Sequence, residues 1–152
     1  MSANLLTIRD IRSRIAGELL RLYEKPEADS LAGIIVRTIT GHTGLHQIMN
    51  HDASVSTEEA AKMTELCNEL MTGKPLQYIL GETEFYNCRI KVTPDVLIPR
   101  PETEELTDLI IKCNHSYGGA IIDFGTGSGC IAVALAANLK EARVTATDLS
   151  LA

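Results

Sequence analysis

The stretch AIIDFGTGSGCIAVALAANLKEARVTATD, residues 120–148, decides the fold of the second half of this 152-residue chain. It predicts a buried apolar strand over 120–124, a glycine loop over 125–129, an alanine-rich helix over 130–139 and a second strand over 143–148 that ends in an acid. Strand, helix and strand in this order form a sheet with parallel strands and a right-handed connection. The expected class of this part is α/β.

The spacing of the glycines narrows the choice of ligand. A dinucleotide-binding loop has Gly or Ala at its sixth place, and here that place is Cys130. A phosphate-binding P-loop has a Lys after its last glycine, and none follows here. Asp123 stands two residues before the first glycine instead, which suits a ligand that carries a positive charge.

A second carboxylate completes the pattern. Asp148 ends the second strand, where a carboxylate in an open α/β sheet accepts hydrogen bonds from ribose hydroxyls. A cationic ligand with a ribose indicates S-adenosyl-L-methionine. The alternative is a tight structural turn beside a surface aspartate. The expected cofactor-binding residues are Gly125, Thr126, Gly127, Ser128, Gly129 and Asp148, with Asp123 as a further candidate.

Residues 1–72 predict a small helical bundle. The first helix is capped by Thr7, with Asp10 three residues on, and has an apolar stripe at Ile8, Ile11, Ile15, Leu19 and Leu22. A second helix is expected to begin after Asp29 or Ser30 and to end at Gly41. Apolar spacing predicts a short third helix with Leu45, Ile48 and Met49, and then a fourth, opened by the capping box of Ser56 and Glu59 and ended near Gly73 and Pro75.

Residues 73–100 predict a β-hairpin linker. Residues 85–92 alternate, with Ile90 and Val92 on one side of a strand and charged residues on the other, and the chain is expected to turn near Asn87. Arg100 lies between two prolines, the second of which suits the first position of a further helix. Glutamates then fill the first turn of that helix, where the helix dipole favours carboxylates.

Composition excludes several classes of protein. The net charge of −6 and the pI of about 5.2 argue against binding nucleic acid directly. With 45% apolar and 22% charged residues the chain resembles an ordinary globular protein. It has neither an apolar run long enough to span a membrane nor a signal peptide, so we expect no membrane association and a cytoplasmic location.

Cysteines and histidines predict no metal site. The cysteines at 67, 88, 113 and 130 form no CxxC pair and are expected to be buried free thiols. His42 and His46 stand four residues apart, which fits a shared metal, but no further ligand joins them at metal spacing. We therefore expect solvated histidines on a helix face.

Four segments carry a resemblance to a known family. They are PLQYILG at 75–81, Phe85-Tyr86, VLIPRPETE at 96–104 and DFGTGSGCIA at 123–132. Together they resemble the HemK-type methyltransferases, the peptide chain release factor glutamine N5-methyltransferases. The resemblance is close from residue 75 onward, and the helical bundle matches the N-terminal domain of the family in kind.

The resemblance implies a reaction and a partner. Such an enzyme transfers the methyl group of S-adenosyl-L-methionine to the side-chain amide N5 of the glutamine in the Gly-Gly-Gln loop of class I release factors. It implies that Arg100 and Glu102 lie beside the active site; the alternative for these two is a helix cap with a solvated Arg. The Asn-Pro-Pro-Tyr motif that holds the target amide in this family does not occur here, so we expect no catalytic residue in this chain and no activity from it alone.

The complete expectation is an α plus α/β protein. Residues 1–72 form a helical bundle of the release-factor-docking type, 73–100 a hairpin linker, and 101–152 the first part of a Rossmann-like class I methyltransferase domain, truncated after its second strand. Uncovered apolar strands are expected to make the chain self-associate. Two other functions stay open: an adenine-N6 DNA methyltransferase, which handles a similar planar amine, and a non-catalytic helical binding module.

Overall fold

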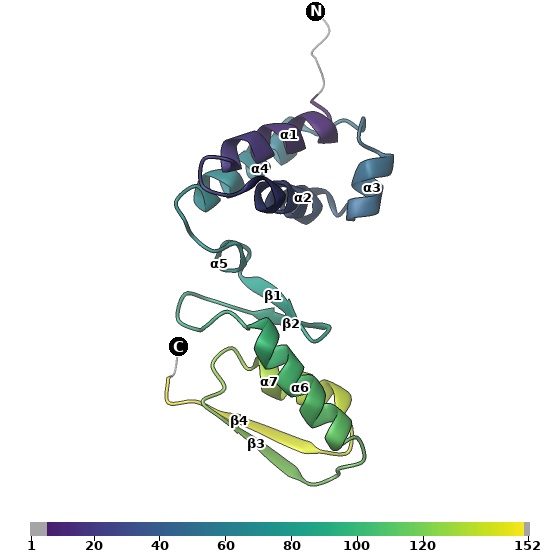
Figure 1. Cartoon of the computed structure of the whole chain (residues 1–152), viewed down its shortest axis with the longest axis vertical. Helices are drawn as coiled ribbons and strands as arrows, with labels where there is room; N and C mark the ends of the chain where they lie inside the picture. Colours follow the sequence, from purple (N-terminus) through teal and green to yellow (C-terminus); the bar gives the residue numbers. More distant parts are fainter. Residues whose placement is uncertain (1–5, 151–152) are drawn as a thin grey trace, which may run out of the picture. The chain divides into compact units, whose positions relative to one another are not determined.

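The computed structural model describes residues 6–150, which fall into two compact units, Met1–Ile79 and Leu80–Ala152 (Figure 1). Each unit is described by itself. The ends of the expected helical bundle and of the expected methyltransferase part, residues 1–5 and 151–152, lie outside the described residues. The division into three parts at 72 and 100 stays a prediction.

The first unit is helical. Helices α1, α2 and α4 pack against one another, and α3 contacts α2 (Figure 1). The helices are α1 (Ile8–Leu19), α2 (Lys25–Thr40), α3 (Gly44–Met49), α4 (Thr57–Leu70) and α5 (Leu76–Leu80).

Caps fix the helix ends where the sequence predicts them. Thr7 and Asp10 form a reciprocal capping box on α1, and Ser56 and Glu59 form another on α4, which satisfies backbone N–H groups that the first helical turn leaves unpaired. Gly41 ends α2 in the left-handed region at φ 71°, and its N–H donates to the Arg37 carbonyl.

The core of this unit is fully enclosed. Ile11, Leu19 and Ile35 have no exposed surface, and the small residues Ala28 and Ala32 let α2 approach its neighbours closely. The buried residues that form the cluster are Ile8, Ile11, Ile15, Ala16, Leu19, Ala28, Ala32, Ile35, Val36, Val55, Met63, Cys67 and Leu70.

Two details of the helical prediction are wrong. Helix α2 begins at Lys25 rather than after Asp29 or Ser30, because Pro26 occupies its first turn, where a missing N–H costs nothing. Leu22 was expected on the buried stripe of the first helix. It lies in the turn after α1, which ends at Leu19, and is 55% exposed.

The second unit combines helices with two small sheets. Its elements are β1 (Glu82–Phe85), β2 (Cys88–Lys91), α6 (Pro101–Cys113), β3 (Ala120–Phe124), α7 (Cys130–Asn138) and β4 (Arg143–Thr147). β1 and β2 form an antiparallel hairpin, and β3 and β4 pair in parallel, with Ile121 opposite Val144. The hairpin and the parallel pairing confirm the sequence prediction. The chain is thus a mixture of helices and small sheets.

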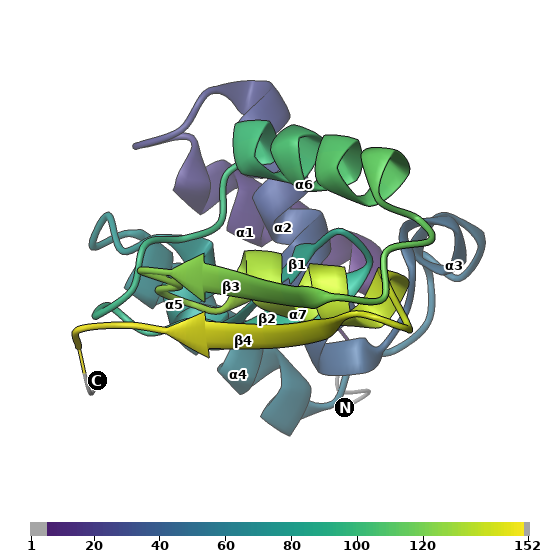
Figure 2. The ribbon, with the colours of Figure 1, turned by 90° about the horizontal axis from the view of Figure 1, so that it is seen from below.

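Helix α7 contacts both strands of the parallel sheet and lies behind it in Figure 2. Ile121 and Asp123 are half-buried, whereas the alternate residues Ile122 and Phe124 are 54% and 78% exposed. The prediction of a buried strand over 120–124 is therefore wrong for one face of β3. Among residues 6–150, β3 packs on α7 and pairs with β4, and the face that carries Ile122 and Phe124 stays open; a strand is buried on both faces only when layers lie on both.

No helix among residues 6–150 is both long enough and apolar enough to cross a membrane.

Candidate functional site

The glycine loop connects β3 to α7, and three of its residues require glycine. Gly125, Gly127 and Gly129 have φ values of 73°, 52° and 75°, in the left-handed region that a Cβ makes costly. Gly129 is also the N-cap residue of α7. The alternation of glycines in the sequence thus reports an alternation of backbone conformation.

Most backbone N–H groups of the loop already donate within the protein. Those of Gly125 and Thr126 donate to the Thr147 carbonyl, at 2.8 and 3.0 Å, and that of Gly129 donates to the Thr126 carbonyl at 2.9 Å. A P-loop binds phosphates because its N–H groups point freely at the ligand. This loop has its N–H groups committed to the end of β4 and to itself, so it does not form that kind of anion cradle.

Asp123 lies on the half-buried side of β3 and supports the loop. Its Oδ2 accepts a hydrogen bond of 2.7 Å from the Thr126 hydroxyl. The Thr147 hydroxyl donates to the backbone carbonyl of Asp123 at 3.3 Å, which links the ends of the two strands. The candidate cofactor residues Asp123 and Thr126 therefore contact each other, and Ser128, one of the others, is half-buried in the same loop.

Asp148 reaches across from the end of β4 to the loop. Its Oδ2 accepts a hydrogen bond from the Gly127 N–H at 2.8 Å, and its Oδ1 accepts one from the Ser150 N–H at 2.9 Å. These two backbone donors, Ser150 first, lower the pKa of the Asp148 carboxyl. The side chain is exposed, and each carboxylate oxygen retains a lone pair for a further donor.

The structure thus brings together all the residues that the sequence predicts as a cofactor site. Two carboxylates, Asp123 and Asp148, accept hydrogen bonds from a loop that offers few free N–H groups. The arrangement is acidic and rich in acceptors. It suits a cation and hydroxyl donors better than it suits a phosphate.

Arg100 and Glu102 do not join this group by any hydrogen bond or ion pair within residues 6–150. Arg100 is the N-cap of α6, with extended backbone and no side-chain capping bond, and Pro101 is the first residue of the helix, as predicted. Both side chains are exposed. Their placement beside an active site stays a prediction.

The sequence did not predict a polar network that links the hairpin turn to α6. The Tyr86 N–H donates to the Glu104 carboxylate, and the Tyr86 hydroxyl donates to Asp108 Oδ1 at 2.9 Å. Lys112 pairs with Asp108 at 2.5 Å; Lys112 first and Tyr86 second lower the pKa of that carboxyl. The network holds the hairpin turn on α6. The only signal for it in the sequence is the spacing of Glu104, Asp108 and Lys112 by four.

The cysteines and histidines differ in part from expectation. Cys67 and Cys130 are buried free thiols, but Cys88 is half-buried and Cys113, in the last turn of α6, is exposed. Burial raises the pKa of the Cys67 thiol. His42 precedes α3 instead of lying on a helix face, and it is half-buried beside His46, with ring centroids 6.3 Å apart. No group of three metal-ligating side chains occurs among the described residues.

Part of the chain matches a known domain family. Residues 14–81 match the model of the PrmC N-terminal domain. This range covers most of the helical unit and ends where the hairpin begins.

Curated relatives extend the match into the second unit. The chain is 40% identical over 146 residues to a release factor glutamine methyltransferase of Streptococcus pneumoniae, covering 95% of this chain and 51% of that protein. It is 36% identical over 149 residues to one of Flavobacterium psychrophilum, covering 95% and 52%. Over 77 residues it is 48% identical to one of Vibrio cholerae, covering 51% and 27%. The chain spans about half the length of the first two relatives.

Proposed function

Over the part that it spans, this chain belongs to the release factor glutamine methyltransferases, and from this we propose that it supplies the S-adenosyl-L-methionine site of such an enzyme. The whole protein would methylate the side-chain amide N5 of the glutamine in the Gly-Gly-Gln loop of class I peptide chain release factors. The site would consist of Asp123, the Gly125–Gly129 loop and Asp148.

One observation carries the cofactor proposal: two carboxylates contact the glycine loop, whose own N–H groups are largely used in hydrogen bonds within the protein. Asp123 would attract the cationic part of the ligand and Asp148 would accept hydrogen bonds from its ribose hydroxyls, whereas a pyrophosphate would be repelled by both carboxylates and would find few donors. Asp148 stands at the carboxyl end of its strand, where ligands bind in open α/β sheets. The parallel unit of β3, α7 and β4 would accordingly be the start of a Rossmann-like methyltransferase domain.

The chemistry fits a site without a base or a metal. When S-adenosyl-L-methionine is bound it supplies a methyl group on a sulfonium sulfur. Asp123, the Gly125–Gly129 loop and Asp148 would hold it for transfer of that methyl group to the amide nitrogen, with the neutral thioether as the leaving group and water as the acceptor of the amide proton. The residues of this chain would fix the donor, and fixed alignment alone can contribute up to about 7–11 kcal/mol in the best intramolecular cases.

We further propose a partner for the helical unit and a cellular location for the protein. The helical unit would dock the release factor, and the protein would work in the cytoplasm. By itself the 152-residue chain would be inactive and would self-associate through the open β3–β4 face, where Ile122 and Phe124 are exposed.

The test of the proposed function compares substrates and variants of the whole protein. Release factor should incorporate labelled methyl at glutamine, and duplex DNA should not. Methyl transfer to DNA would instead favour the adenine-N6 reaction, and transfer to neither would favour a binding module.

A calorimetric titration of the whole protein tests the cofactor site. In it, Asp148→Ala should weaken S-adenosyl-L-methionine binding about tenfold or more, because hydrogen bonds to a charged group contribute roughly 1.5–3 kcal/mol. Asp95→Ala is the control, since Asp95 is an exposed aspartate in the loop after β2. Equal affinities of the two variants by calorimetry would show that Asp148 does not bind the ribose.

A further inference from the structure

A groove of about 540 Å³ runs between α1, α2 and the segment that contains α3, within the helical unit. Arginine, histidine and glutamine side chains line it together with apolar ones. The lining residues that matter here are Arg9, Arg12, Asp29, Gln47, Ile48 and His51.

Most charges in this groove are neutralised by neighbours. Arg9 pairs with Asp52 at 3.2 Å, and the His51 ring lies 3.1 Å from the same carboxylate. Asp29 pairs with Lys25 at 2.9 Å. Arg12 differs, because its guanidinium has neither an ion pair nor a hydrogen bond within residues 6–150. One positive charge is therefore left over at the groove.

Arg12 is not simply a solvated surface side chain. It is half-buried, and its guanidinium lies over Gly33 of α2, where a Cβ would be 3.5 Å from Nη2. The guanidinium thus packs within van der Waals distance of the backbone of α2 at Gly33. Gln47, only 3% exposed, approaches the same residue from α3, and its Nε2 donates to the carbonyls of Gly33 and His42, both at 2.9 Å.

Gln47 leaves an acceptor unused. Because both partners of Nε2 are carbonyls, the amide cannot be flipped, and Oε1 finds no donor in the part of the chain that the structure describes. Buried polar atoms without partners are uncommon and call for an explanation. A free cation and an unpaired acceptor thus belong to one groove, with the 65% exposed Ile48 in its lining.

We propose that this groove binds a carboxylate-bearing segment of a partner protein, with the carboxylate on Arg12 and an apolar side chain of the segment on Ile48. A guanidinium pairs with a carboxylate by two parallel hydrogen bonds. The single free charge matches one carboxylate. A nucleic acid or a phosphopeptide would bring more negative charge than the groove neutralises, to a chain whose net charge is already −6.

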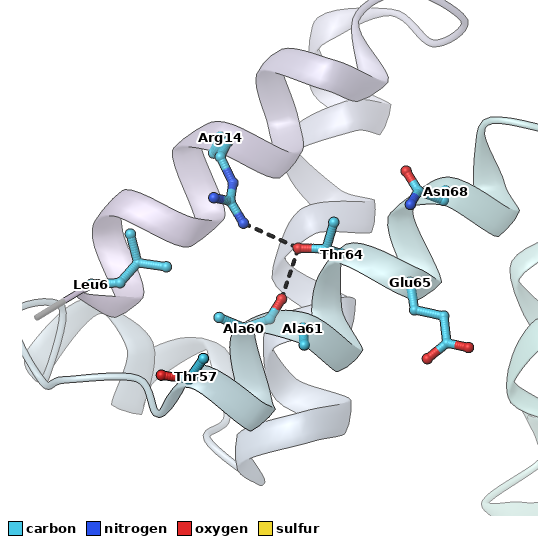
Figure 3. A pocket seen from close by; sticks show the side chains of 8 residues that line it. All are labelled: Leu6, Arg14, Thr57, Ala60, Ala61, Thr64, Glu65 and Asn68. Carbon is cyan, nitrogen blue, oxygen red and sulfur yellow. Dashed lines mark hydrogen bonds between the residues drawn. The ribbon is translucent and has the colours of Figure 1, made fainter.

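A second groove on the same helix provides the contrast. Figure 3 shows Arg14 on the α4 side of α1, where Nη2 donates to the Thr64 hydroxyl at 3.0 Å, and that hydroxyl donates to the Ala60 carbonyl. Arg14 and Arg12 are two positions apart and differ in that Arg14 has a partner. The proposal is independent of methyl transfer, because it concerns only the helical unit and its test contains neither cofactor nor release factor.

The experiment titrates the 152-residue chain, labelled with ¹⁵N, with the blocked peptide acetyl-Leu-Leu-Glu-Leu-Leu-amide, which carries one carboxylate, and with the same peptide carrying Gln for Glu. We expect shifts of amide signals around Arg12, Gln47 and Ile48 with the Glu peptide. The variant Arg12→Gln should bind it about tenfold more weakly, as the loss of one charge-assisted hydrogen-bonded pair predicts. Arg14→Gln, the matched control, should bind as the unchanged chain does.

Ile48→Asp gives an independent readout, because the side chain is exposed and the substitution leaves the core intact. It places a carboxylate in the groove and should also abolish binding of the peptide. Equal binding of the Glu and Gln peptides, equal losses in the two arginine variants, or shifts confined to other helices would overturn the proposal. Displacement of the peptide by inorganic phosphate would overturn the assignment to a carboxylate.

Discussion

The core of the helical unit and the outer face of β3 in the second unit bury their apolar residues to very different extents. In the helical unit, Ile11, Leu19, Ile35 and Met63 are fully enclosed, whereas β3 of the second unit exposes Ile122 and Phe124. In the helical unit apolar residues recur every three or four positions along α1, α2 and α4, and these stripes form the buried core. In the second unit the candidate site is formed at the ends of strands whose outer face is open. Packing fixes the core of the first unit, and hydrogen bonds to the backbone fix the glycine loop of the second.

The largest effect is expected when an apolar side chain is shortened in each unit, which tests this contrast. Ile11→Ala should lower the free energy of unfolding of the helical unit by about 2–5 kcal/mol, because a fully buried side chain leaves a cavity. Ile122→Ala, on the open face of β3, should change the stability of the second unit by less than about 0.5 kcal/mol. Urea denaturation followed by circular dichroism, at a protein concentration at which the chain is monomeric, measures both. Similar losses in the two variants would mean that the face of β3 is covered in solution.

Glycines provide a second, smaller test. Gly127→Ala should destabilise the loop by about 1–2 kcal/mol, because an L-residue is forced into the left-handed region at φ 52°. Gly17→Ala in α1 should have the opposite sign and stabilise by up to about 1 kcal/mol, because the helix prefers Ala and nothing lies within 4 Å of the added methyl. Thermal unfolding of the two variants measures these changes in stability. A Gly127 variant as stable as the parent would show that the loop adopts another conformation.

The smallest effect is the response of the loop to acid. The pKa of Asp148 is lowered in the folded chain, so its hydrogen bonds are fully present above the ordinary pKa of an aspartate and are lost as the pH falls through the lowered value. The amide proton of Gly127 should therefore move upfield in NMR spectra over that acidic range. The Gly129 amide is the control, since it donates to the carbonyl of Thr126, which does not titrate. Parallel changes in both amides would indicate general unfolding.

Local signals in the sequence predicted much of this architecture. Thr7–Asp10 and Ser56–Glu59 capping boxes, the left-handed end of α2 at Gly41 and the turn at Asn87 all follow from short-range chemistry. The start of α2 was missed because Pro26 reads as a helix breaker when its place in the first turn is not considered. Local sequence signals therefore predict most helix ends. Proline is the exception, because it occurs both in the first turn of a helix and after its last turn.

Contacts between distant residues were harder to predict. The pairing of Asp148 with Gly127 requires both strands to be in register, and the sequence indicated only that the two residues belong to one site. The hydrogen bonds of Tyr86 with Glu104 and Asp108 have no periodic signal linking the hairpin to α6. The exposure of Cys113 and Phe124 depends on which layers cover them, which apolar spacing does not report.

The most direct test of the cofactor site is an NMR titration of the 152-residue chain with S-adenosyl-L-methionine. We expect weak binding, with shifts confined to the amides of Gly125–Gly129 and to the residues around Asp148. These shifts should disappear in Asp148→Asn and persist in the control Asp95→Asn. Shifts that are confined to the helical unit, or that Asp148→Asn leaves unchanged, would contradict the assignment of this loop as the cofactor site.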